Sequence, residues 1–234
     1  MNINYGTIDE EDVPAFQFTK QSYKKEGDRS NVGDYEYDRE LSNVDTAVWH
    51  NKANKKTYVS SRGSKTAYDW GVSDMQIATG TEGSGARFNN ALNTTRLAHE
   101  KYGYNVSTSG HSLGGKVSAY TTEKLGNEAW YDKGTGFNQG TSAVGSDSLW
   151  SKQRRDCSSA TPPAYCSKQT NIKHDGDPVS MNKDAFGTTK VYGHKRGVIN
   201  RIALFLSPTY RTAQNLNAHR LSNFSLPTNT TTKR

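Results

Sequence analysis

The sequence predicts an α/β fold with a mostly parallel central sheet flanked by helices and an N-terminal β-hairpin at the edge of the sheet. Two observations lead to this prediction. Runs of β-prone residues alternate with helix-like segments through the middle of the chain, an order typical of parallel sheets. Before them, residues 44–49 and 57–61 resemble two strands around the polar turn at 52–55, which indicates a hairpin.

The later elements are predicted from periodicity and from residues that end helices. Apolar residues recur every three to four positions over 86–102, which indicates a helix. A strand from Asn105 leads through a glycine-rich turn into a second helix over 113–125, which stops at Gly126. Further strands are expected at 130–138, 171–173 and 188–192, and weaker helices around 147–155 and 211–221.

Length and composition indicate one domain. A chain of 234 residues is long enough to form its own core. Only 32% of the residues are hydrophobic and the mean hydropathy is −0.89, so we expect an economical core and a very polar surface. Residues 1–40 read as polar and irregular. The α/β domain is placed at 35–225, between a polar N-terminal segment (1–34) and a disordered basic tail (226–234), with bounds that follow the extent of the motifs described below.

The charge is unevenly distributed along the chain. The formal net charge is +7, and eight lysine and arginine residues but no acidic residue follow Asp184. Such a region suits contact with phosphate, anionic lipid or an acidic partner, and a solvated face is the alternative. No run of 18 apolar residues and no secretory signal is visible, so neither a membrane span nor secretion is expected and an intracellular or virion-associated location is favoured.

The two cysteines leave the redox compartment open. Cys157 and Cys166 either close a small disulfide loop in an oxidising setting or stay free thiols inside a cell. No cluster of cysteine and histidine has the spacing of zinc ligands, so a structural zinc site is not expected.

The most informative stretch is Gly110-His111-Ser112-Leu113-Gly114-Gly115. Its Gly-x-Ser-x-Gly pattern, between a predicted strand and a predicted helix, is that of the nucleophile elbow of α/β-hydrolases. Glycine is needed on both sides of the serine because side chains there would collide with the neighbouring strand and helix. The following helix would aim its first amides at developing negative charge. A tight turn with an ordinary surface serine is the alternative.

A serine nucleophile needs a base, and the base needs a residue that orients it. In α/β-hydrolases the chain order is serine, acid, histidine. The histidines after Ser112 are His174, His194 and His219. The candidate acids at a strand end are Asp175 and Asp177, because sites in open α/β sheets form after the carboxyl ends of the strands.

Five segments follow one another in the order of a known set of motifs. They are Tyr58-Val59-Ser60-Ser61-Arg62-Gly63-Ser64, Asp69-Trp70 with Asp74, the elbow, Asp177-Pro178-Val179, and Ala218-His219-Arg220-Leu221-Ser222-Asn223-Phe224. Together, over about residues 35–225, they resemble the class 3 lipases, the fungal-lipase-like branch of α/β-hydrolases that has viral members. Ser180 departs from the proline usual after the Asp-x-Val motif.

The resemblance implies a serine carboxylic-ester hydrolase of lipase or phospholipase type. It makes Ser112 the nucleophile, His219 the general base and then acid, and Asp177 the residue that orients the imidazolium. The backbone amide of Leu113, with the amide and hydroxyl of Ser64, would form the oxyanion hole. It implies no cofactor and no metal, and a lipid or other acyl ester as the substrate.

Alternatives remain at several positions. Asp175 is the reserve acid, His194 is the alternative base, and Ser64 is otherwise a plain loop residue. We expect Arg62 to bind a carboxylate such as Asp74. His111 is expected to pack behind the elbow rather than transfer protons.

The substrate class and the rival functions are open. Residues 78–86, where many lipases have an apolar lid, are polar, so a small ester or a phospholipid is as plausible as a triglyceride. The basic C-terminal region suits peripheral contact with an anionic membrane. Nucleic acid is disfavoured because aromatic residues do not alternate with the basic ones. The alternative function is a structural or virion-associated protein that keeps the lipase fold with little or no turnover.

Overall fold

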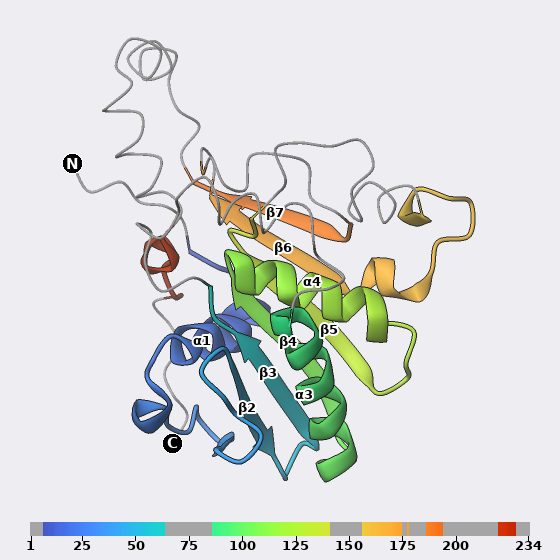
Figure 1. The fold of residues 1–234 in the computed structure, drawn as a ribbon. Helices are drawn as coiled ribbons and strands as arrows, with labels where there is room; N and C mark the ends of the chain where they lie inside the picture. The colour runs from blue at the N-terminus through green and yellow to red at the C-terminus, as the bar shows by residue number, and fades with distance from the viewer. Residues whose placement is uncertain are drawn as a thin grey trace, which may run out of the picture.

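A computed structural model describes residues 7–63, 86–140, 156–174, 177, 186–193 and 220–227. These residues form a seven-stranded sheet with the strands in chain order (Figure 1). The strands are β1 (Glu36–Asp38), β2 (Thr46–Asn51), β3 (Lys56–Ser61), β4 (Asn105–His111), β5 (Tyr131–Phe137), β6 (Gln169–His174) and β7 (Thr188–Tyr192). The helices are α1 (Val13–Ser22), α3 (Ala86–Tyr102) and α4 (Leu113–Leu125), with short 3₁₀ turns η1 (Glu10–Asp12), η2 (Glu26–Asp28), η3 (Ala164–Ser167) and η4 (Leu221–Asn223).

The sheet confirms the predicted fold class. Strands β1, β2 and β3 pair antiparallel, and every pair from β3 to β7 is parallel. The predicted hairpin is β2–β3, whose register pairs Asn51 with Lys56 across the turn. Parallel strands place all their carboxyl ends at one edge of the sheet, which is where sites form in open α/β sheets.

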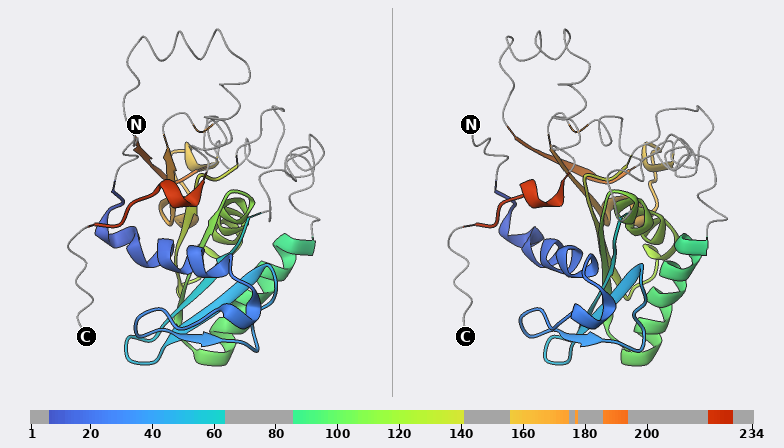
Figure 2. Two further views of the ribbon diagram at one scale, coloured as in Figure 1. Left: turned by 90° about the vertical axis from the view of Figure 1, so that its left-hand side faces the viewer. Right: turned by 60° about the vertical axis from the view of Figure 1, so that its left-hand side comes forward.

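Helices cover both faces of the sheet. Figure 2 shows α1 on one face and α3 with α4 on the other. Side chains alternate accordingly: Trp49 and Tyr58 lie in the core under α1, whereas Val48 and Val59 lie in the core under α3. The predicted helices at 86–102 and 113–125 have the predicted bounds, because their apolar periodicity is uninterrupted and Gly126 follows the second one.

The expectation that residues 1–40 are irregular is wrong over α1. Phe16 and Phe18 of this helix are buried in the same core as Trp49 and Phe137. A ten-residue helix with so few apolar residues is marginal in isolation, and its stability comes from packing on the sheet, which composition does not reveal. A proline in its first turn was the local signal of a helix start.

The interior on the α4 side of the sheet is unusually polar. The hydroxyl of Tyr131 bonds to the hydroxyls of Thr108 (2.6 Å) and Thr122 (2.7 Å). Thr122 donates to Oε1 of Gln169 (3.0 Å), and Nε2 of Gln169 donates to Oδ1 of Asn171 (3.1 Å). Buried polar groups are tolerated when they satisfy one another in this way, so the low hydrophobic content is compatible with a folded core.

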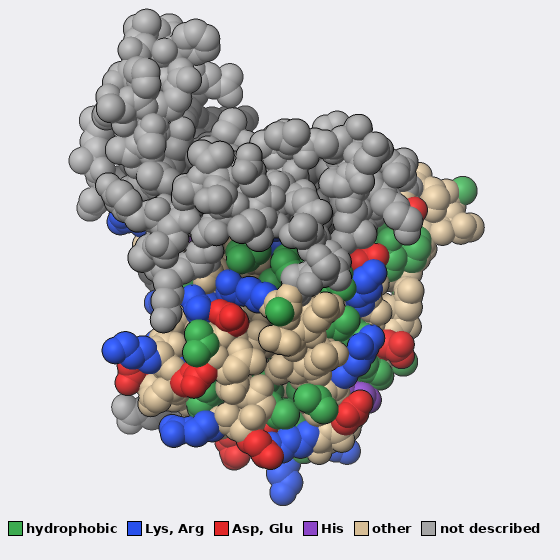
Figure 3. Space-filling view, in the orientation of Figure 1, with side chains coloured by type: hydrophobic (Ala, Val, Ile, Leu, Met, Phe, Trp, Pro, Cys, Tyr) green, Lys and Arg blue, Asp and Glu red, His purple; other side chains and the backbone are tan. Residues whose placement is uncertain are grey.

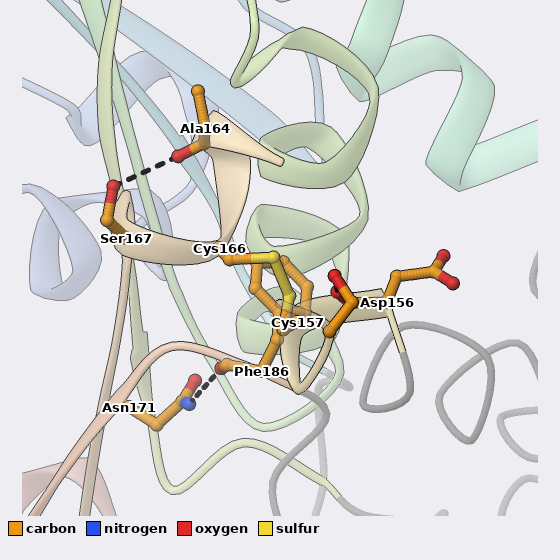
Figure 4. The surroundings of a disulfide bond; sticks show 8 residues. Asp156, Cys157, Ala164, Cys166, Ser167, Asn171 and Phe186 are labelled. Carbon is orange, nitrogen blue, oxygen red and sulfur yellow. Dashed lines mark hydrogen bonds between the residues drawn. A yellow bond between two sulfur atoms is a disulfide. The ribbon is translucent and has the colours of Figure 1, made fainter. Parts of the chain in front are cut away.

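The two cysteines form a disulfide. Cys157 and Cys166 are joined, with Cα atoms 5.5 Å apart, beside η3 (Figure 4). They pack against a small core of Ala119, Tyr165 and Phe186. The disulfide therefore ties residues 156–166 to α4 and to the start of β7.

An ion cluster joins the N-terminal region to the far edge of the sheet. Nζ of Lys190 on β7 donates to Asp9 (2.9 Å), Glu11 (2.5 Å) and Asp12 (2.6 Å). The hydrogen bond from Lys190 is the main cause that lowers the pKa values of Asp9 and Glu11. Because Asp12 is only 1% exposed, Lys190 also neutralises a buried carboxylate.

Some expectations lie outside the described residues. They concern the helix around 147–155, most of the helix at 211–221, and the end of the tail at 228–234.

Within the described ranges, none of the helices combines the length and apolar character needed to cross a bilayer. On the face in Figure 3, the described lysine and arginine side chains are interspersed with aspartate and glutamate, so the charge there is mixed.

The ion cluster predicts a loss of stability in acid. The folded-state pKa values of Asp9 and Glu11 lie below those of the unfolded chain, which are about 4. These carboxylates therefore stabilise the fold above about pH 4, and that contribution disappears as the pH falls through the folded-state values. We expect urea unfolding between pH 6 and pH 2.5 to show this loss. The free energy of unfolding should fall less in acid for the double variant Asp9→Asn with Glu11→Gln than for the wild type.

The matched control is Glu26→Gln with Asp28→Asn, which changes two exposed carboxylates of η2. Its free energy of unfolding should fall in acid as that of the wild type does. Equal slopes for both double variants would show that Lys190 does not shift the titration of its partners.

Candidate active site

The elbow has the backbone geometry that the sequence predicts. Strand β4 ends at His111, and α4 begins at Leu113. Ser112, between them, has φ 57° and ψ −122°, an arrangement that L-residues rarely adopt. Such strain concentrates at functional sites because the surrounding structure has to enforce it.

Two glycines make this turn possible. A Cβ on Gly110 would collide with the backbone of Gly114 and lie 2.7 Å from the carbonyl oxygen of Ser61. A Cβ on Gly114 would collide with that same oxygen and lie 2.8 Å from the carbonyl of Arg62. The Gly-x-Ser-x-Gly pattern is therefore required by the close approach of β4, α4 and the end of β3.

The side chain of Ser112 is not used as a cap of α4. Its carbonyl accepts the amide of Lys116 (3.2 Å), and its own amide donates to the carbonyl of Phe137 (3.0 Å). Leu113 occupies the first position of α4, where amides have no partner within the helix and the helix dipole is positive. Its amide is thus of the kind that stabilises an anion beside Ser112.

Asn138 links the ends of β5 and β6. It follows β5 with φ 41° and is fully buried. Its amide donates to the carbonyl of Ile172 (2.7 Å), and its side-chain oxygen accepts the amide of His174 (2.9 Å). Since Phe137, the residue before it, accepts the amide of Ser112, one run of hydrogen bonds connects the elbow to the end of β6.

Asp177 lies just beyond β6. It is fully buried, and its amide donates to the carbonyl of His174 (3.2 Å). The ring of His174 stacks on Phe224, with ring centroids 3.9 Å apart. Phe224 also contacts Phe137 edge-on, with centroids 5.5 Å apart. The segment at 220–227 therefore rests on the ends of β5 and β6, and the second of these leads to Asp177.

The structure does not describe every predicted site residue. His219, the alternative base His194, Ser64 and the reserve acid Asp175 lie outside the described residues, as do Asp69, Trp70, Asp74 and 78–85. His174, the third histidine after Ser112, is described and packs against Phe224. The structure thus describes Ser112 and Leu113 at the end of β4 and Asp177 just beyond β6, with β5 between the two strands, and leaves the base and Ser64 as predictions.

Arg62 binds a carboxylate as expected, and the carboxylate is that of Asp45. Its Nη2 lies 2.7 Å from Oδ1 of Asp45, and its Nε donates to the carbonyl of Val44 (2.8 Å). Arg87 on α3 donates to the carbonyl of Arg62 and lies 3.6 Å from the same carboxylate. Two guanidinium groups therefore hold the end of β3, next to the elbow.

Tyr23 was missed by sequence reasoning. It is the residue that ends α1, and its hydroxyl lies 2.7 Å from Nδ1 of His111 and 2.9 Å from the amide of Gly63. Burial of the hydroxyl raises the pKa of Tyr23 to about 12, although 36% of the residue as a whole is exposed. His111 does lie behind the elbow, where it is 7% exposed.

Sequence signals for the other missed residues were weak. Asp45 is the second residue of the predicted strand at 44–49, Asn138 is the last residue of the predicted strand at 130–138, and both are residue types common in turns. Only the positive φ of Asn138 and the pairing of β2 with β3 reveal their roles.

Among the described residues, Asp9, Glu11 and Asp12 have the spacing of a metal site, but the ammonium of Lys190 lies among them.

The close approach at the elbow predicts that Gly114→Ala destabilises the protein. The new Cβ would push the ends of β3 and α4 apart, and overpacking of this kind costs about 1–3 kcal/mol. Gly27→Ala is the matched control, since nothing lies within 4 Å of its Cβ. Chemical unfolding should show a clear loss for Gly114→Ala and none for Gly27→Ala. Equal stabilities would mean that the elbow is looser than described.

Comparison with solved structures identifies the fold. Lip2 lipase from Yarrowia lipolytica matches with a TM-score of 0.50 and 18% sequence identity over 80% of each chain. A triacylglyceride lipase from Rhizomucor miehei matches with a TM-score of 0.45 and 14% identity over 78% of each chain. A triacylglycerol lipase from Penicillium expansum matches with a TM-score of 0.45 and 18% identity over 80% of each chain.

Sequence comparisons add no family. No protein-family model matches the chain, and no curated protein matches it. At identities below 25%, the structural likeness shows the fold alone. The mixed seven-stranded sheet of the described residues, with helices on both faces, is the α/β-hydrolase-like fold that Lip2 lipase also has.

Proposed function

We propose that this protein is a serine carboxylic-ester hydrolase of lipase or phospholipase type. The observation that supports it best is the strained, positive-φ backbone of Ser112 between β4 and α4. The second support is the run of hydrogen bonds from this turn through the ends of β5 and β6 toward Asp177. A surface serine in an ordinary turn would need neither feature.

In the proposed reaction, Oγ of Ser112 attacks the ester carbonyl while the imidazole of His219 takes its proton. His219 then gives this proton to the departing alkoxide, which leaves an acyl group on Ser112. A water molecule, deprotonated by His219, hydrolyses the acyl-enzyme. Asp177 orients the imidazolium and stabilises its charge, as a buried carboxylate at this position suits.

Contacts of Phe224 support the assignment of His219. Phe224 follows this histidine by five residues and stacks on His174, three residues before Asp177. The two segments that would supply acid and base therefore approach each other at the strand ends. The choice of His219 over His194 rests on the sequence motif around His219.

The proposed oxyanion hole consists of the amide of Leu113 with the amide and hydroxyl of Ser64. Support comes from Gly63, the residue before Ser64, because a Cβ on it would lie 3.2 Å from Cβ of Ser112. Gly63, directly before Ser64, thus lies against the elbow. Each such donor typically contributes about 2.7–4 kcal/mol to transition-state stabilisation.

We propose an acyl ester of a lipid as the substrate class. Two of the structural neighbours are named as lipases of triacylglycerides or triacylglycerols. The polar residues 78–86 and the basic C-terminal region favour an ester presented at an anionic surface, such as a phospholipid. Release of fatty acid from phospholipid vesicles and from triglyceride emulsions would distinguish the two.

An active-site-directed fluorophosphonate tests the nucleophile. The wild type should be labelled and should hydrolyse p-nitrophenyl butyrate, and Ser112→Ala should lose both, with a fall in kcat of about 10⁴-fold or more. The melting temperature should change little, because the Ser112 side chain does not cap α4. The matched control Ser159→Ala alters an exposed serine and should behave as the wild type.

Absence of labelling and hydrolysis in the folded wild type would contradict the proposed function. It would favour the alternative of a structural or virion-associated protein that keeps the fold. Labelling that persists in Ser112→Ala would instead move the nucleophile to another residue.

A further inference from the structure

We propose that Tyr23 is a positioning residue of the esterase site, through which α1 fixes the elbow and the oxyanion-hole loop relative to each other. This inference rests on the proposed function. The hydroxyl of Tyr23 bridges Gly63, which precedes Ser64, and His111, which precedes Ser112. A single hydroxyl thus contacts the neighbours of both the proposed nucleophile and a proposed oxyanion donor.

The two hydrogen bonds of the Tyr23 hydroxyl differ in kind. The backbone amide of Gly63 can only donate, so Oη of Tyr23 accepts at 2.9 Å. Between Oη and Nδ1 of His111, 2.7 Å apart, the tautomer of the imidazole decides which atom donates. Burial raises the pKa of Tyr23 to about 12, so the hydroxyl keeps its proton at neutral pH.

Helix α1 is held against the two strands whose ends Tyr23 joins. Phe18 stacks on Tyr58 of β3, with ring centroids 4.3 Å apart. Thr19 donates to the hydroxyl of Ser109 on β4 (3.1 Å). The helix therefore has a fixed position on β3 and β4. Tyr23, which follows its last turn, places its hydroxyl between the residues at the carboxyl ends of these two strands.

Gly63 is held from both sides. Its amide bonds to Tyr23, and its carbonyl accepts Nη1 of Arg62 (3.3 Å) and Nη2 of Arg87 (3.4 Å). A Cβ on Gly63 would collide with Oη of Tyr23 and lie 2.9 Å from the carbonyl oxygen of His111. Loss of the phenol oxygen would leave the amide without this acceptor and open space beside the elbow, so the two loops would lose their fixed separation.

A positioning role predicts a specific kinetic change. Misplacement of reacting groups by about 1 Å can cost about 100-fold in rate, whereas binding of a small ester is less sensitive. For Tyr23→Phe we expect kcat with p-nitrophenyl butyrate to fall by about tenfold or more, with KM within about twofold. The rate of fluorophosphonate labelling should fall in parallel.

The matched control is Tyr131→Phe. Its hydroxyl is also buried and also makes two hydrogen bonds, but its partners are Thr108 in the middle of β4 and Thr122 in the last turn of α4, not residues next to the elbow. This variant should lower the melting temperature and leave kcat near that of the wild type. Tyr23→p-aminophenylalanine, which keeps a donor and a lone pair on a ring of the same size, should restore part of kcat.

Each outcome separates the two proposals. If the wild type neither hydrolyses the ester nor reacts with the fluorophosphonate, the proposed function fails. If the wild type is active and Tyr23→Phe has an unchanged kcat, the positioning role fails while the function stands. A loss seen only in KM or only in the melting temperature also overturns it, and so does a Tyr23→p-aminophenylalanine variant that folds but recovers no kcat.

Discussion

Between β4 and α4 the backbone reverses so sharply that the start of the helix occupies the space where a side chain on Gly110 would lie. This steric constraint accompanies the positive φ of Ser112 and the close approach of the Ser61 carbonyl to Gly114. The strand ends around this turn then have little freedom. Under the proposed function, a serine held in this way would have its orientation fixed before any substrate arrives.

The surroundings of the turn hold it from three directions. Asn138 connects it to β6 and so to Asp177, by hydrogen bonds that bridge consecutive parallel strands. Arg62 and Arg87 share the carboxylate of Asp45 and fix the end of β3. Tyr23 completes the set from the opposite face of the sheet. These contacts require little distortion of the backbone, because the backbone groups that they use lie at strand ends and have no partner within the sheet.

Local patterns predicted much of the fold and the tight strand-to-helix turn at Ser112. The apolar periodicity predicted the bounds of α3 and α4, and the closely spaced glycines on both sides of Ser112 predicted the turn. What the sequence could not reveal depends on tertiary packing. Helix α1 is stable only on the sheet, Arg62 binds Asp45 because β2 pairs with β3, and Tyr23 reaches His111 across 88 positions. His219 and Ser64 remain predictions from the resemblance to class 3 lipases.

The central claim is that Ser112, Asp177 and His219 form one catalytic unit with an oxyanion hole at Leu113 and Ser64. A crystal structure of the protein after reaction with a phosphonate ester tests it most directly. The account predicts phosphorus bonded to Oγ of Ser112, the imidazole of His219 within hydrogen-bond distance of both that oxygen and the leaving-group position, and a phosphonyl oxygen between the amides of Leu113 and Ser64. Phosphorus on another residue, or a histidine other than His219 beside Ser112, would contradict it.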